Sequence, residues 1–348
     1  MCQRSISAQT VEERWEKAVS DTDWNSNLGG GFGLHRPEDE YFHGTGEPVD
    51  SLTETWYWNF HVPEAAINCF AYCWVHPALK TVTAGLMIFK GIKTSHLACE
   101  LLEFRDFNSI SIIGDGSDIR VPNGMRVETV KPLEHVRLTF ADPQRETSVD
   151  VDIRAMGVPI MRANNKHFEQ VMHVTGTLTL RGETYPVDCS AVRDRSWAEP
   201  RPENHNPAPP YTWVTGTFGE DFAFNVGSHD DPERDPDWKG VMPVPSRVFN
   251  DGWVVVNGEQ RRVRNASKLT RRTADRFAPI SHDYTFEDES GDTYHITGEI
   301  VAQAPWGGWS NMTCHIGLVK WNWNGRTGYG ESQEVQWNDY VWKMSQRL

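Results

Sequence analysis

The sequence predicts an all-β protein made of two antiparallel β-barrels in tandem. Apolar and polar residues alternate along most of the chain from residue 51 onward, a proline-rich segment interrupts the alternation, and no long amphipathic helix is evident. Alternation with a period of two is typical of half-buried antiparallel strands. Closure of each sheet into a barrel removes its exposed edges, which suits an acidic, soluble chain.

The individual strands follow from this alternation. In the first half it is clearest in the segments 56–61, 69–76, 135–140, 150–154 and 174–181. Residues 200–210 contain five prolines in eleven positions, so we expect a linker or a long loop there. Alternation resumes at 222–226 and continues through 252–256, 282–287, 293–302, 312–323 and 328–337. The count is about nine strands on each side of the prolines, at the short spacing of a sandwich or barrel.

These observations divide the chain into three parts. Residues 1–50 form an N-terminal extension, 51–195 the first barrel and 196–348 the second barrel. Within the extension we expect a short helix at 11–19 and a flexible glycine-rich loop at 28–33, which lacks the Lys-Ser/Thr of a phosphate-binding loop. The acidic segment 230–237 is predicted to be a polar surface loop.

Composition excludes several classes of partner. The chain of 348 residues has a net charge of −14, which argues against nucleic acid and against an anionic membrane surface. It has no apolar stretch of about 20 residues, and its start is too polar for a signal peptide, so we expect no membrane insertion and a cytoplasmic location. The six cysteines include no CxxC pair and are predicted to be reduced, buried thiols.

Familiar cofactor and metal motifs are also missing. The sequence has no HExxH and no close His/Cys/carboxylate cluster, no GxSxG, and no GxGxxG after a strand. We therefore expect neither a metal nor a cofactor. Fifteen tryptophans are unusual, and they fit either core filling or an aromatic wall around a hydrophobic ligand.

Four segments carry a family resemblance: ETWYWNF at 54–60, WVHPALKTVTAGLMIFKG at 74–91, HFEQVMHVTGTLTLRGETYPVDCSAVRDRSW at 167–197 and NGRTGYGESQE at 324–334. Together they resemble the AttH-like and carotenoid 1,2-hydratase-like (hydroxyneurosporene synthase) superfamily of tandem lipocalin-like proteins, in particular its uncharacterised bacterial branch. The resemblance implies calycin-type barrels with a cavity, a hydrophobic small molecule, and chemistry without a redox cofactor. One departure is that the usual Ser-Trp-Gly-x-Arg is here Ser-Trp-Ala-Glu-Pro-Arg at 196–201.

Asp194 is the first candidate for catalysis. Hydration or isomerisation of an alkene begins with protonation of carbon, which needs an acid held in a dry pocket, and apolar walls keep a carboxyl group protonated. Trp197 and Trp213 are candidates to stabilise the resulting cation with their ring faces. The alternative is structural: Arg193, Asp194 and Arg195 form an ion-pair corner that locks the two barrels together.

Other candidates share strand faces. Glu169 and His173 are four residues apart, so one face carries both, and they are candidates to place water or to act as base. The alternative is a polar pair that faces solvent. Further candidates for substrate binding are Tyr72, Trp74 and His76, although a satisfied core histidine explains His76 as well. The weaker carboxylate candidates are Glu54, Glu100 and Asp106.

Three functions are compatible with this pattern. The first is a cofactor-independent lyase or isomerase, of the hydratase, dehydratase or cyclase type, acting on an isoprenoid-, steroid- or polyketide-like molecule by acid catalysis. The second is a non-catalytic carrier of a hydrophobic small molecule, which needs only a lined cavity. The third is a purely structural protein whose barrels are filled by tryptophan. The sequence leaves the oligomeric state open.

Overall fold

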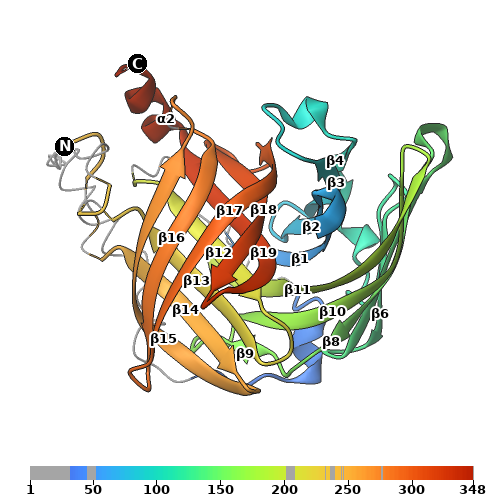
Figure 1. The fold of residues 1–348 in the computed structure, drawn as a ribbon. Coiled ribbons are helices and arrows are strands. Elements are labelled where there is room, and N and C mark those ends of the chain that lie inside the picture. The colour runs from blue at the N-terminus through green and yellow to red at the C-terminus, as the bar shows by residue number, and fades with distance from the viewer. Residues whose placement is uncertain are drawn as a thin grey trace, which may run out of the picture.

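The computed structural model describes residues 32–44, 52–200, 208–231, 233–235, 240–243, 245, 247–275 and 277–347. The helix expected at 11–19, most of the glycine-rich loop, Cys2 and Arg201 lie outside these ranges. Figure 1 shows a closed barrel, coloured yellow to red, beside a curled sheet, coloured blue to green.

The first sheet has eleven strands in the order β4-β3-β2-β1-β11-β10-β8-β7-β6-β5, with β9 paired to β10. Their bounds are β1 (Leu52–Val62), β2 (Ile67–His76), β3 (Thr81–Lys90), β4 (Leu101–Ser109), β5 (Asp118–Arg120), β6 (Arg126–Lys131), β7 (His135–Asp142), β8 (Thr147–Ala155), β9 (Ile160–Met161), β10 (His167–Leu180) and β11 (Glu183–Pro200). The sheet curls without closing, because β4 and β5 at its ends do not pair. Its central strands are β1, β11 and β10.

The second sheet is a closed barrel of eight strands in sequence order. Their bounds are β12 (Tyr211–Thr217), β13 (Phe222–His229), β14 (Phe249–Val256), β15 (Glu259–Arg272), β16 (Pro279–Asp288), β17 (Thr293–Trp306), β18 (Met312–Trp323) and β19 (Arg326–Trp337). The described helices are short: α2 (Asn338–Ser345) and the 3-10 turns η2 (Pro37–Glu40), η3 (Pro63–Ala65), η4 (His96–Ala98), η5 (Ile110–Ile112) and η6 (Pro143–Arg145).

The predicted all-β class and its lipocalin-like barrel architecture are confirmed. In detail, the first unit is a curled open sheet, and the strands number eleven and eight where about nine and nine were expected. The chain passes from the first sheet to the second between Pro200 and Tyr211. Residue 195, the predicted end of the first barrel, lies within β11. The domain boundary at 195/196 stays a prediction. None of the described helices is long and apolar enough to cross a membrane.

Alternation sorts the side chains into three buried layers. One face of the curled sheet holds a core that includes Trp56, Trp58 and Phe60, together with Cys69 and Cys73 as free thiols. The barrel lumen holds a second core of aromatic and branched residues. The other face of the curled sheet packs against the barrel wall, and the members of this third cluster, here called the central layer, include Tyr57, Phe70, Tyr72, Trp74, Val171, Val192, Trp213, Trp253, Trp306 and Ile316.

Candidate functional site

The central layer contains a row of polar side chains that crosses four strands. In the strand register Glu169 of β10 lies opposite Asp194 of β11, Asp194 lies opposite Tyr57 of β1, and Tyr57 lies opposite Tyr72 of β2. Trp213 of the barrel stands edge-on to the Tyr57 ring, with centroids 6.0 Å apart. Four residues singled out from the sequence, Glu169, Asp194, Tyr72 and Trp213, are thus brought into one buried layer.

Glu169 is buried beside Arg162 and His167. The Arg162 guanidinium donates to its carboxylate at 3.0 Å, and His167 Nε2 lies 3.4 Å from the same oxygen. Burial by itself raises the pKa of Glu169, but Arg162 and His167 lower it by more, so the pKa is below its ordinary value. Glu169 is therefore suited to the role of a base or of a group that orients water, rather than that of a proton donor.

Asp194 lies on the opposite face of β11 from the two arginines beside it. Its side chain is 17% exposed, and His167 Nε2 lies 3.8 Å from its Oδ2. Arg193 pairs with Glu40 at 2.6 Å, and Arg195 pairs with Glu54. Successive residues of a strand point to opposite faces. The two arginines therefore form their ion pairs on the far side of the sheet, with Glu40 and Glu54 rather than with the barrel.

An ion-pair chain links the row to the barrel. Arg162, which holds Glu169, also approaches Asp251 of β14 with 3.4 Å between Nε and Oδ2, and Arg262 of β15 donates to Asp251 at 2.7 Å. Burial raises the pKa of Asp251 by more than the two arginines lower it. The chain ties the curled sheet to the barrel beside the candidate site.

Glu331 of β19 is a second buried acid in the same layer, and it was missed by sequence reasoning. Asn59 and Asn68 donate to its Oε2 at 3.1 and 3.3 Å, and Gln333 donates to Oε1 at 2.8 Å. No ion pair to Glu331 occurs in the described part of the chain. Burial raises its pKa by more than the amide and hydroxyl donors around it lower it. The available signal was a carboxylate inside the alternating segment 328–337.

Glu169 and Glu331, two of the carboxyl groups in the layer, thus have environments that move their pKa values in opposite directions. The pKa of Glu169 is lowered by an arginine, and the pKa of Glu331 is raised by burial among neutral donors. Such pairs are typical of sites that carry out acid and base chemistry together. The geometry therefore supports proton-transfer chemistry in the central layer.

Other predicted residues lie at the margin of the layer or outside it. His173 shares the face of Glu169 but sits further along β10, where its side chain is 47% exposed and bonds Asp188. Trp197 is buried on the other side, stacked on His43 with centroids 4.0 Å apart. Trp74 belongs to the layer, and His76 contacts its ring at the end of β2.

The weaker carboxylate candidates are not in the layer. Glu54 pairs with Arg195, Glu100 accepts a hydrogen bond from Lys93, and Asp106 is exposed. Ala198, which stands where the family pattern has glycine, adopts a left-handed φ of 51°. Glycine is favoured at such a position because it has no Cβ.

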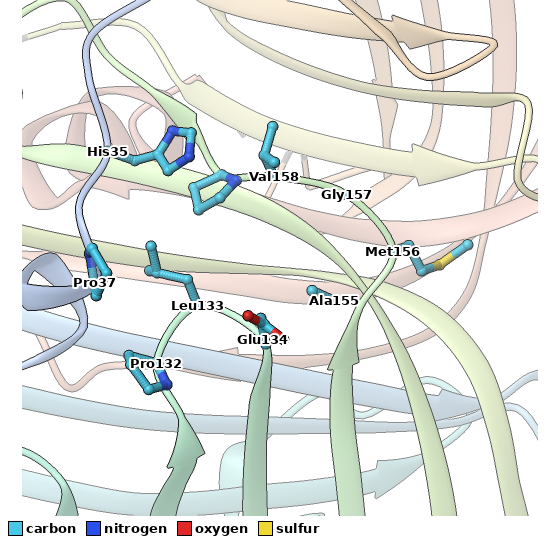
Figure 2. Close-up of a pocket in the computed structure, with 10 residues that line it drawn as sticks. His35, Pro37, Pro132, Leu133, Glu134, Ala155, Met156, Gly157 and Val158 are labelled. Carbon is cyan, nitrogen blue, oxygen red and sulfur yellow. The ribbon is translucent and has the colours of Figure 1, made fainter.

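A surface groove lies behind β10, on the side away from the row. It has a volume of about 560 Å³ and is lined by the turn 132–134, the loop 155–159 and His35 and Pro37 (Figure 2). Gln170, which points to this side of β10, donates to the carbonyls of Leu133 and Gly157. Met156 lines the groove and also packs against the central layer.

No group of three or more His, Cys, Asp or Glu side chains within the described ranges is placed to hold a metal ion. Of the carboxylates in the layer, Glu169 already pairs with Arg162, and Glu331 accepts from the Asn59 amide.

Solved structures with a similar fold cover most of this chain. Kievitone hydratase from Nectria haematococca is similar with a TM-score of 0.54 and 13% identity, covering 89% of this chain and 94% of that one. CghA in complex with Sch210972 gives a TM-score of 0.52 and 11% identity over 90% and 98% of the two chains. A putative AttH from Nitrosomonas europaea gives 0.49 and 13% over 89% and 98%. At these identities the first two similarities show a shared fold, and it is the lipocalin-like fold that the family resemblance implies.

Residues 36–339 match the family model described as a domain of unknown function, DUF7064, and the chain belongs to that family. No curated protein matches the sequence.

Proposed function

We propose that this protein is a cofactor-independent enzyme of the hydratase, dehydratase or cyclase type, which acts on a hydrophobic small molecule in the central layer. The buried row of Glu169, Asp194, Tyr57 and Tyr72 against Trp213 carries the proposal. The similarity in fold to a protein named as a hydratase supports it. Isoprenoid-, steroid- and polyketide-like compounds fit the aromatic and apolar surroundings.

Asp194 is the proposed proton donor. In the hydration of an alkene its proton is added to one carbon, and the cation left on the neighbouring carbon is stabilised by the Trp213 ring face. A water molecule oriented by Glu169 then attacks that carbon and releases a proton to the Glu169 carboxylate. Exchange of this proton with Asp194, which lies opposite Glu169 in the strand register, directly or through water, restores the donor. Dehydration is the reverse of these steps. His173 and Trp197 are left out of the proposed site because neither reaches the layer.

The first experiment identifies the ligand. Native mass spectrometry of the protein purified from its own host, followed by solvent extraction, names the class of any bound compound. That compound is then incubated with the wild-type protein and with Asp194→Asn. We expect turnover by the wild type and a loss of at least 100-fold in the variant, as is typical when a general acid is removed.

The matched control is Asp188→Asn. Asp188 lies on the same strand and the same face as Asp194, but its side chain is 78% exposed. This variant should retain full activity. Full activity in Asp194→Asn would remove the assignment of the proton donor, and binding without turnover by the wild type would establish the carrier function instead.

A further inference from the structure

The cluster around Glu331 contains buried acceptors without donors. Asn59 of β1 and Asn68 of β2 are 3% and 0% exposed, and each uses its Nδ2 to donate to the Glu331 carboxyl. The Oδ1 atom of each amide is buried and has no hydrogen-bond partner among the described residues. Buried side-chain oxygens are nearly always hydrogen-bonded in folded proteins. Two such oxygens on neighbouring strands therefore point to a ligand that donates hydrogen bonds.

A third buried polar atom of the cluster also lacks a hydrogen-bond partner among the described residues. His61 lies opposite Asn68 in the register of β1 and β2, and its buried Nδ1 has no partner in the described structure. Burial lowers the pKa of His61 to about 4, so the ring is neutral. The cluster therefore offers neutral hydrogen-bonding atoms around one carboxyl group.

We propose that Asn59, Asn68 and Glu331 form a subsite that binds a hydroxyl group, so that the ligand of the central layer is a hydrophobic small molecule carrying an alcohol or a phenol. The proposal rests on the central layer being the substrate site, as in the proposed function. It does not require that the protein be a catalyst.

The chemistry of the cluster favours a hydroxyl over other groups. A hydroxyl donates to an amide oxygen and accepts from a carboxyl proton, and the raised pKa of Glu331 keeps that proton in place to higher pH than in an exposed glutamate. An anionic group would meet Glu331 with no ion-pairing cation in the described cluster. A pure hydrocarbon would leave both amide oxygens unpaired, which is unfavourable.

The subsite also lies close enough to the row of Glu169, Asp194, Tyr57 and Tyr72 for one ligand to reach both. Asn59 follows Tyr57 by two residues on β1 and points to the same face, so the two are about 7 Å apart. Phe70 lies opposite Asn59, and Val171 and Val192 occupy the neighbouring strands. A ligand anchored by its hydroxyl at Asn59 and Asn68 therefore extends over apolar side chains toward Asp194.

The test uses two probes of the same shape, 2-naphthol and 2-methylnaphthalene, titrated calorimetrically into the full chain. We expect the wild type to bind 2-naphthol roughly tenfold more tightly, the size of one to two hydrogen bonds to buried acceptors. Asn68→Leu should abolish this preference, and Asp188→Asn at the surface should leave it unchanged. Glu331→Gln, which keeps a donor at the carboxyl position, should retain it.

Asn59→Leu gives a second route if Asn68→Leu does not fold, as judged by circular dichroism. Equal affinities in the wild type, absence of binding of either probe, or a preference that survives both leucine variants would overturn the subsite. Asp194→Asn separates this proposal from the proposed function. It should keep the preference for 2-naphthol whether or not the protein catalyses a reaction.

Discussion

The barrel lumen and the Glu331 cluster of the central layer each bury carboxyl groups, but the partners of those groups differ. In the lumen Arg272 pairs with Glu334 at 2.8 Å and with Asp230 at 2.9 Å, and Lys268 pairs with Asp230 at 3.1 Å. His282 bonds Thr270 and Ser332. In the central layer Glu331 has only neutral donors, and the oxygens of Asn59 and Asn68 lack partners in the described structure.

The pKa values follow this difference. Burial raises the pKa of Glu334, but Arg272 and Lys268 bring it down to about 2, so it is a fixed anion. Burial dominates for Glu331 and raises its pKa. A network with its charges paired stabilises one conformation, whereas unpaired buried polar groups are typical of functional sites. We therefore interpret the charged network around Arg272 as structural and look for chemistry in the central layer.

The largest expected effect breaks the lumen network. Arg272→Met leaves Glu334 and Asp230 buried without their main cation, so the free energy of unfolding should fall by about 3–5 kcal/mol. Urea unfolding followed by tryptophan fluorescence measures it. A loss below about 1 kcal/mol would mean that the two carboxylates find other partners or become protonated.

A second variant tests the layer through pH. The pKa of Glu331 is raised in the folded state, so the group favours folding while protonated, and this contribution is lost as pH rises above 4.5, the ordinary pKa of glutamate. Glu331→Gln does not titrate, and its stability relative to the wild type should increase with pH. Urea unfolding of both proteins across a pH series checks this.

The other titratable groups that face Glu331 do not contribute to the pH dependence measured in that experiment. Tyr57, Cys69 and Cys314 all have pKa values raised by burial and by Glu331, so they stay neutral across the range. A difference between the two proteins that is flat with pH, or that falls, would show that Glu331 is ionised in the folded state.

The smallest expected effect is at the surface. Arg326 forms a bidentate pair with Asp221, with side chains 40% and 49% exposed. Arg326→Met should change stability by no more than about 1 kcal/mol, because exposed pairs contribute little. Replacement of arginine by methionine is thus compared at an exposed ion pair and at the buried pair of Arg272. Similar losses in the free energy of unfolding at both positions would contradict the conclusion that burial makes the lumen pair the stronger one.

Much of the fold was predictable because strand alternation is a local property. It indicated the strands at 252–256 and 282–287, the shared face of Cys69 and Cys73, and the shared face of Tyr72 and Trp74. The acidic loop after β13 shows the limit of this reasoning. It was predicted to face solvent, but Asp230 and Asp235 are buried because Arg272 in the lumen attracts them.

The sequence by itself determined which side chains share a face, since parity along a strand separates Asp194 from Arg193 and Arg195. Only the tertiary structure decided which strands lie side by side and what covers them. The pairing of β1 with β11 brings Tyr57 to Asp194, and the contact between Asn59 and Glu331 spans 272 residues. Glu169 and His173 have the same parity, yet only Glu169 is buried in the layer, while His173 lies at an exposed position of the same face. The strand register, and which side chains of a face are buried, depend on packing between distant segments, which no local pattern encodes.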